Sequence, residues 1–172
     1  ISVDDESGLG AIASRMQVVF KDNKIFLNGK DVTELIREEK IGTRASQLAI
    51  YPEVRDALLV LQQSFREQPG LVADGRDMAS RIFTDAVLKV YLTATVQARA
   101  ERRYKQLIAK GISARMDVLL QDLKERDARD TNRGTAPLQR VEGAYLLDTS
   151  NLSVNQAVAQ VVSWYAELHR QL

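Results

Sequence analysis

The chain contains no cysteine and a single histidine, His169, among its 172 residues. The first absence excludes a disulfide framework, a thiolate nucleophile and a cysteine metal site. The second gives little support to a Ser–His–Asp triad or a histidine metal cluster. His169 lies near the end of the last expected helix, where an exposed cationic imidazole interacts favourably with the helix dipole. Chemistry that depends on a strong side-chain nucleophile is therefore not expected.

Long apolar runs and an excess of one charge are also missing. No stretch is long enough to cross a bilayer, and no signal peptide is recognisable. The 24 Lys and Arg against 23 Asp and Glu give a net charge of +1. This balance gives no general reason to expect a nucleic acid or an anionic membrane as a partner. We expect a cytoplasmic protein of one domain, or one with a subdomain, with a sizeable core.

The order of apolar segments predicts an α/β protein. Short apolar runs typical of buried parallel strands occur at 71–73, 87–92 and 144–147. Helical spacing and capping residues predict helices at 33–40, ending before Gly42, at 52–65, at 95–110, from Ser113 onward, and from Ser153 to the end. Two short strand candidates at 17–20 and 24–27 flank a turn and look like a small β insert.

The polar tetrad Asp74-Gly75-Arg76-Asp77 directly follows the apolar run at 71–73. Because ligands bind beyond the carboxyl ends of parallel strands, these residues are candidates for a site. Arg76 offers a planar fork to a phosphate or a base edge, and Asp77 can accept from an amino group. A surface turn closed by an Arg–Asp pair explains the same residues equally well.

A second group of arginines lies on the helix predicted from Thr95. Arg99, Arg102 and Arg103 stand at positions i, i+3 and i+4, so their guanidinium groups share one face. Like charges packed this closely cost stability unless an anion lies among them. The alternative is a solvated face whose charge is relieved by Glu101 and by acid contacts elsewhere.

Further arginines occur in two other segments. Arg126, Asp130 and Arg133 stand at i, i+4 and i+7 of one helical stripe, where ordinary surface ion pairs are the alternative interpretation. Ser46 and Arg55 form another candidate group. Arginines gathered in separate places, without a histidine, cysteine or glycine-rich motif, suggest that the chain handles a polyanion by positioning and charge.

Together these segments resemble bacterial cytidylate kinases, which belong to the nucleoside monophosphate kinases of the P-loop group. The matching stretches are 45–47 (ASQ), 51–58 (YPEVRDAL), 69–77 (PGLVADGRD), 99–103 (RAERR), 125–133 (ERDARDTNR) with Ala136-Pro137, and 147–149 (LDT). They appear in the family's order over almost the whole chain. The resemblance implies a P-loop NTPase-like three-layer α/β sandwich with a parallel sheet. It also implies a monophosphate-binding region at 1–66 with the β insert at about 15–32, and a core at 67–172 with a helical lid at about 99–133.

The resemblance implies transfer of the γ-phosphoryl group of ATP to CMP or dCMP, giving CDP or dCDP, with Mg²⁺. No nucleic-acid or membrane partner is implied, and we expect a monomer. Arg55, Asp77 and Arg133 resemble residues that recognise the cytosine base. Ser46, Arg126 and Asp130 resemble those that bind the sugar, and Arg76 resembles an arginine on the CMP phosphate. Arg99, Arg102 and Arg103 resemble the lid arginines on the ATP side. Arg76 and Arg133 are the candidates for a catalytic role.

One departure from the family pattern concerns the phosphate loop. The 172 residues contain no G-x-x-x-x-G-K motif, and Gly8-Leu-Gly10 is too short a match. We expect about fifty further residues before Ile1, carrying this loop and a central strand, and exposed apolar sheet edges in their absence. The 172-residue chain alone is predicted to be inactive as a kinase. The alternative is a non-catalytic nucleotide-binding module that keeps only the monophosphate pocket.

Overall fold

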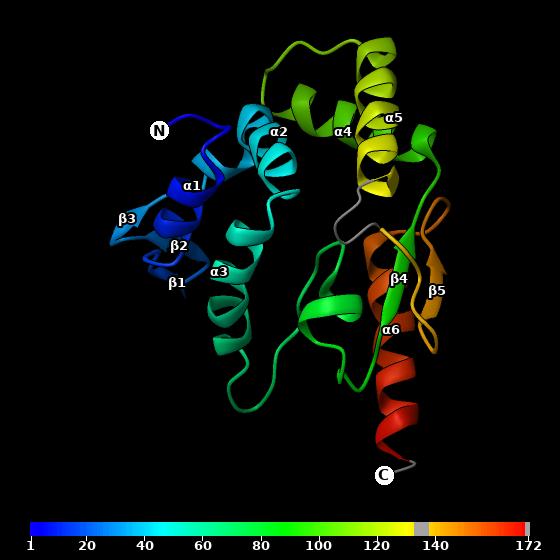
Figure 1. The fold of residues 1–172 in the computed structure, drawn as a ribbon. Coiled ribbons are helices and arrows are strands. Elements are labelled where there is room, and N and C mark those ends of the chain that lie inside the picture. The colour runs from blue at the N-terminus through cyan, green and yellow to red at the C-terminus, as the bar shows by residue number, and fades with distance from the viewer. Residues whose placement is uncertain (133–137, 171–172) are drawn as a thin grey trace. The chain divides into compact units, whose positions relative to one another are not determined.

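The computed structural model describes residues 1–132 and 138–170, which divide into two compact units (Figure 1). The first unit is Ile1–Gly75, and the second comprises 76–132 with 138–170. The first contains antiparallel strands and helices, and the second contains parallel strands and helices. The described residues therefore form the mixed α/β structure that the sequence predicts.

The first unit carries the predicted small β insert. Strands β1 (Val18–Lys21), β2 (Lys24–Leu27) and β3 (Lys30–Asp31) form an antiparallel sheet in that order. Asp22 and Asn23 connect β1 to β2 with φ angles of 50° and 59°. Two successive left-handed residues match the twist of a two-residue hairpin, and Asp and Asn tolerate that conformation better than most residues.

Helices pack beside this sheet within the first unit. They are α1 (Glu6–Ala13), the short 3₁₀ turn η1 (Leu35–Arg37), α2 (Glu39–Leu48) and α3 (Pro52–Ser64). Pro52 occupies the first turn of α3, where its missing N–H costs nothing. The Ser7 hydroxyl donates to the Glu53 carboxylate at 3.1 Å, and the Glu53 amide donates to Glu6 at 3.0 Å. These contacts hold the start of α1 against the start of α3.

The prediction of a helix at 33–40 that ends before Gly42 is wrong, because this stretch contains the 3₁₀ turn η1 and only the start of α2. Helix α2 runs through this glycine, whose amide donates to the Glu38 carbonyl at 3.2 Å. A glycine inside a helix costs about 1 kcal/mol relative to alanine, but it keeps its amide donor and does not break the helix. The continued helix carries Ser46 in its last turn.

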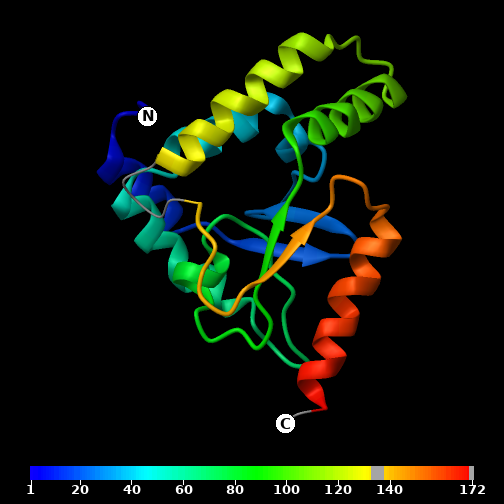
Figure 2. The same cartoon turned by 90° about the vertical axis from the view of Figure 1, so that its right-hand side faces the viewer.

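The second unit is built on two parallel strands, β4 (Val90–Thr93) and β5 (Tyr145–Asp148), with Leu92 paired to Leu147. Helix α6 (Val154–His169) lies beside them (Figures 1 and 2), and the Trp164 and Tyr145 rings stand 4.8 Å apart. The predicted cap at Ser153 is confirmed as a complete capping box with Gln156.

Helices α4 (Val96–Ala109) and α5 (Met116–Asn132) form a hairpin in the second unit (Figure 2). Thr95 caps α4 as predicted, since its hydroxyl accepts from the Ala98 amide at 3.2 Å. Gly111 follows the helix with a φ of 72°, a conformation that favours glycine. None of the helices in the described ranges combines the length and the apolar character that a bilayer crossing requires.

The prediction of a buried strand at 71–73 is wrong for the described structure. Val72 is fully exposed and Leu71 is 41% exposed. None of the described strands pairs with this segment, so its backbone has no ladder partner. An apolar run becomes a strand only when a neighbour accepts its backbone hydrogen bonds. Apolar side chains are also exposed on the strand pair itself, at Leu92 (65%) and Leu146 (51%).

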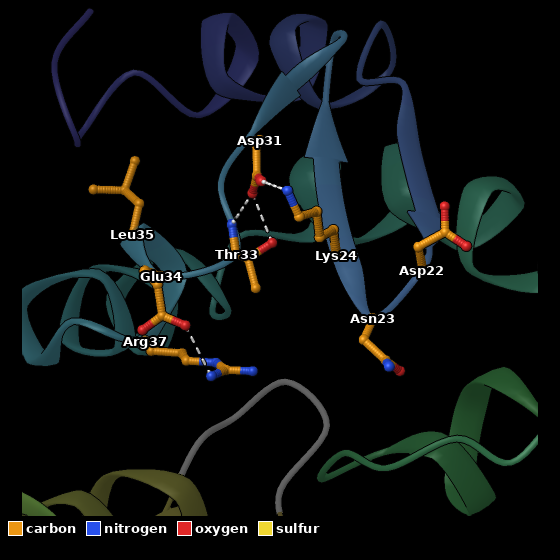
Figure 3. A pocket seen from close by; sticks show the side chains of 8 residues that line it. All are labelled: Asp22, Asn23, Lys24, Asp31, Thr33, Glu34, Leu35 and Arg37. Carbon is orange, nitrogen blue, oxygen red and sulfur yellow. Dashed lines mark hydrogen bonds and ion pairs between the residues drawn. The ribbon is translucent and has the colours of Figure 1, made fainter.

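A hollow of about 590 Å³ opens on the surface of the first unit (Figure 3). Its lining consists of Asp22, Asn23, Lys24, Asp31, Thr33, Glu34, Leu35 and Arg37. The Thr33 hydroxyl donates to the Asp31 carboxylate at 2.7 Å, and Lys24 lies 3.3 Å from the same carboxylate. Among the described residues, none of those predicted to bind nucleotide lines this hollow.

The hydrogen bonds in this lining give a testable prediction for the pKa of Asp31. The Thr33 hydroxyl, the Thr33 amide and Lys24 together hold the pKa of Asp31 below its usual value, with the hydroxyl as the largest cause. We expect Thr33→Val to raise the Asp31 pKa, measured by carboxylate titration in NMR, and Thr33→Ser to preserve it. A lowered folded pKa stabilises the fold above the usual Asp pKa, and this stabilisation is lost as the pH falls through the folded value. An unchanged Asp31 pKa in Thr33→Val would contradict the assignment.

Candidate functional site

Two of the predicted site residues belong to the first unit. Ser46 lies in α2, and its hydroxyl is buried without a hydrogen-bond partner in the described part of the chain. Arg55 lies in the first turn of α3 and donates from Nη1 to the Ala49 carbonyl at 3.3 Å, just past the end of α2. The two helices thus present a hydroxyl and a guanidinium from adjoining segments.

An ion pair in the second unit joins Asp130 and Arg76. Asp130 lies near the end of α5 and is only 4% exposed. Arg76 Nε donates to its Oδ2 at 2.9 Å, while the Arg76 side chain stays 44% exposed. A buried carboxylate needs such a partner, because an unpaired charge out of water is costly. The pair therefore orients a guanidinium whose outer part reaches solvent.

Arg126 stands one helical turn before Asp130 on α5, so the two side chains share a face. Its Nε is buried and has no hydrogen-bond partner among the described residues. Buried polar nitrogens are nearly always paired, so this nitrogen is suited to a ligand oxygen. Arg76 and Arg126 with one carboxylate leave a surplus positive charge, which favours an anionic ligand.

The other two residues predicted for the monophosphate site are Asp77 and Arg133. Asp77 follows Arg76 and directly precedes the short π-helical turn η2 (Met78–Ile82), and its carbonyl accepts from the Arg81 amide at 2.9 Å. Its side chain is half-buried and has interactions of its own. Arg133 lies outside the described residues, so its predicted roles in cytosine reading and catalysis stay predictions.

The structure separates the three lid arginines into different contacts. Arg99 donates from Nη1 and Nη2 to the two carboxylate oxygens of Asp127 at 2.8 and 2.5 Å, and from Nε to the Ala94 carbonyl at 3.2 Å. This pairing raises the pKa of Arg99 above its usual value. Sequence reasoning named Glu101 as the neighbouring counter-charge, but Glu101 accepts from Gln97 at 2.9 Å.

Arg102 binds the turn that follows β5. It donates to the Thr149 hydroxyl at 3.2 Å and also to the Thr149 carbonyl. Thr149 is 7% exposed, and its hydroxyl donates to the Thr93 carbonyl at 3.0 Å. The carboxyl ends of β4 and β5 are thereby tied to the first turns of α4. Arg103 is half-buried and has its own interactions.

Sequence reasoning missed Asp127 and Thr149. Asp127 lies 28 residues from Arg99, and Thr149 lies 47 residues from Arg102. No local spacing rule reaches that far. The signals in the sequence were the density of charge in 125–133 for Asp127 and the matching stretch 147–149 for Thr149. Among the described residues no group of three or more His, Cys, Asp or Glu side chains gathers, so no residue is assigned to a metal.

The buried pair gives a prediction on stability. We expect Asp130→Asn to lower the free energy of unfolding by about 2 kcal/mol, because it strands Arg76 and a buried amide. This is less than the roughly 3–5 kcal/mol typical of fully buried pairs, since Arg76 is partly solvated. Asp117→Asn, which breaks an exposed pair with Arg115 at the other end of α5, is the control and should leave the urea midpoint unchanged. Equal effects of the two variants would mean that the Asp130 pair is not stabilising.

Comparison with known proteins gives matches over nearly the whole length of the chain. The model of the family described as cytidylate kinase matches residues 1–167. A cytidylate kinase of Polynucleobacter asymbioticus is 62% identical over 165 residues, which cover 96% of this chain and 75% of the relative. Those of Cupriavidus pinatubonensis and Burkholderia pseudomallei are 56% and 53% identical, covering 99% and 98% of this chain and 77% and 74% of the relatives. With a family match of this extent and relatives this similar, the chain belongs to the cytidylate kinase family.

Proposed function

We propose that this chain acts in the transfer of the γ-phosphoryl group of ATP to CMP or dCMP, giving CDP or dCDP. Family membership supports the reaction class. The structural observation that carries the proposal is the placement of two arginines, Arg76 and Arg126, at Asp130 of α5. Arg76 is held by the buried Asp130, and the Nε of Arg126, one turn earlier, is buried without a partner among the described residues.

Phosphoryl transfer requires little covalent chemistry from the protein. The attacking group is a phosphate oxygen of the monophosphate, which is ionised at neutral pH and needs no protein base. Catalysis therefore consists mainly of positioning the phosphates and neutralising their charge. In this chain the half-exposed guanidinium of Arg76 would bind the monophosphate, and Arg126 would donate to the sugar. This agrees with a sequence that has no cysteine and one histidine.

Base selection would depend on Asp77. Cytosine presents an amino donor beside its N3 and O2 acceptors, whereas uracil presents a carbonyl and an N–H. A carboxylate matches the amino group and meets the uracil carbonyl with opposed lone pairs. Roles for Ser46 at the sugar, and for Arg55 and Arg133 at the base, stay part of the proposal.

Mg²⁺ would enter with ATP, whose phosphates supply most of its oxygen ligands, and it would supply charge neutralisation there. The described residues show no cluster of carboxylates suited to hold it by themselves. No step is therefore assigned to a protein-bound metal. A cytoplasmic location, a monomeric state and the absence of a nucleic-acid partner also stay predictions.

A non-catalytic module that only binds the monophosphate is the alternative function. Membership of a family named for kinases does not favour it. The two are separated by a coupled kinase assay on the protein expressed from its complete reading frame. ADP release that depends on CMP supports the kinase, and tight CMP binding without ADP release supports the module.

Direct binding tests the monophosphate site without requiring turnover. We expect isothermal titration of the 172-residue chain to give a lower Kd for CMP than for UMP or AMP. The buried Nε of Arg126 and the half-exposed Arg76 would bind the sugar and the phosphate of all three nucleotides. The preference for CMP would come from Asp77. Failure to bind CMP, or equal affinity for all three nucleotides, would contradict the proposed function.

Asp77→Asn tests base selection. The substitution removes the negative charge and one of the two acceptor oxygens that face the amino group of cytosine, so we expect CMP binding to weaken by about 2–4 kcal/mol and UMP binding to change little. Arg126→Gln should weaken CMP and UMP equally, because it removes a contact to the sugar and not to the base. Asp74→Asn, at an exposed aspartate of the same tetrad, is the control. Equal losses for both nucleotides in Asp77→Asn would mean that Asp77 is structural.

A further inference from the structure

Two carboxylates near the end of α5 each hold an arginine from another part of the second unit. Asp130 binds Arg76, and Asp127, three residues earlier, binds Arg99 of α4. Arg126 lies directly before Asp127 in the chain. The helical turn that begins at Arg126 is therefore held by two charged contacts, at Asp127 and at Asp130.

Arg99 and Asp127 form a bidentate ion pair, and Arg99 makes a further hydrogen bond to the backbone. Two parallel N–H bonds join its guanidinium to both oxygens of Asp127, and Nε binds the Ala94 carbonyl directly after β4. A bidentate pair of this kind fixes orientation as well as distance. The two side chains are 31% and 38% exposed, so solvent screens them less than a surface pair. One arginine thus joins the carboxyl end of β4, the first turn of α4 and the last turns of α5.

We propose that Asp127 is a positioning residue for the monophosphate site. With Arg99 as its partner, it sets the position of the end of α5 relative to the carboxyl end of β4. It thereby sets the direction in which the neighbouring Arg126 presents its guanidinium. Where it concerns CMP, this inference rests on the proposed function.

The same contacts favour a positioning role for Arg99 over direct binding of ATP. The resemblance implies that Arg99 binds ATP, but three of its five N–H groups already bind Asp127 and the Ala94 carbonyl. A phosphate of ATP would have to displace a bidentate carboxylate to use the same face of the guanidinium. In this structure Arg99 acts through Asp127 and the helix that carries it.

The test is a double-mutant cycle on the 172-residue chain with Asp127→Asn, Arg99→Gln and the double variant. Asp117→Asn is the matched control, because it breaks an exposed Asp–Arg pair at the opposite end of the same helix. We expect each single variant to raise the Kd for CMP by about three- to tenfold, with no further increase in the double variant. The control should bind CMP as the wild type does.

A second readout needs no nucleotide. Amide exchange over 124–132 should accelerate equally in Asp127→Asn and Arg99→Gln and stay unchanged in Asp117→Asn. Failure of the wild type to bind CMP would contradict the proposed function alone, since amide exchange still decides whether the pair positions α5. If a single variant does not fold, the charge-exchanged variant Arg99→Asp with Asp127→Arg is used. It should bind CMP with the affinity of the wild type, and its amide hydrogens over 124–132 should exchange as slowly as those of the wild type.

Unchanged amide exchange over 124–132 in both single variants would overturn the inference, and so would any of three results on affinity and kinetics. The first is additive losses of CMP affinity in the double variant. The second is a folded charge-exchanged variant that does not regain affinity. The third comes from the enzyme expressed from its complete reading frame: an increase in the KM for ATP in Arg99→Gln, with both KM values unchanged in Asp127→Asn, would assign Arg99 to ATP.

Discussion

The burial of the Asp130 carboxylate is the constraint on which the candidate site depends. Removing an ionised carboxylate from water costs several kcal/mol, and only a well-placed cation with hydrogen-bond geometry offsets it. Arg76 supplies that cation from 54 residues away in the sequence. Because Arg76 must stay with Asp130, the segment after Gly75 and the end of α5 are held together. A contact that the fold requires thus also orients the group suited to bind a phosphate.

At the carboxyl ends of β4 and β5, side chains that stabilise the fold also shape the edge where a ligand would bind. The Thr149 amide and hydroxyl both donate to the Thr93 carbonyl, at 2.8 and 3.0 Å, and Arg102 donates to Thr149 in turn. The Ser150 hydroxyl accepts from the Thr95 amide at 2.8 Å. These bonds extend the pairing of β4 and β5 beyond the strands into the start of α4. In parallel sheets this edge is where ligands bind, so its rigidity serves the site.

Local rules predicted the elements that local interactions determine. Thr95 and Ser153 were recognised as helix caps, and the hairpin at Asp22 and Asn23 was recognised from its composition, because each depends on residues within four positions. The strand at 71–73 and the helix end at Gly42 were predicted wrongly. A strand at 71–73 would need a partner strand, which the composition of a segment does not reveal. The helix continues through Gly42 because glycine keeps the backbone N–H that the helical hydrogen bond requires. Asp127 was missed for the related reason that its partner is distant in the sequence.

Val72 gives the chain a practical property. Its side chain is fully exposed, and it lies four residues before Arg76 in a segment without strand pairing. Since the protein has no cysteine, a single thiol introduced there would be the sole site of attachment for a maleimide dye. Its fluorescence would report on the surroundings of the candidate site without a background of other labelled positions, and without removing any side chain to which we assign a role.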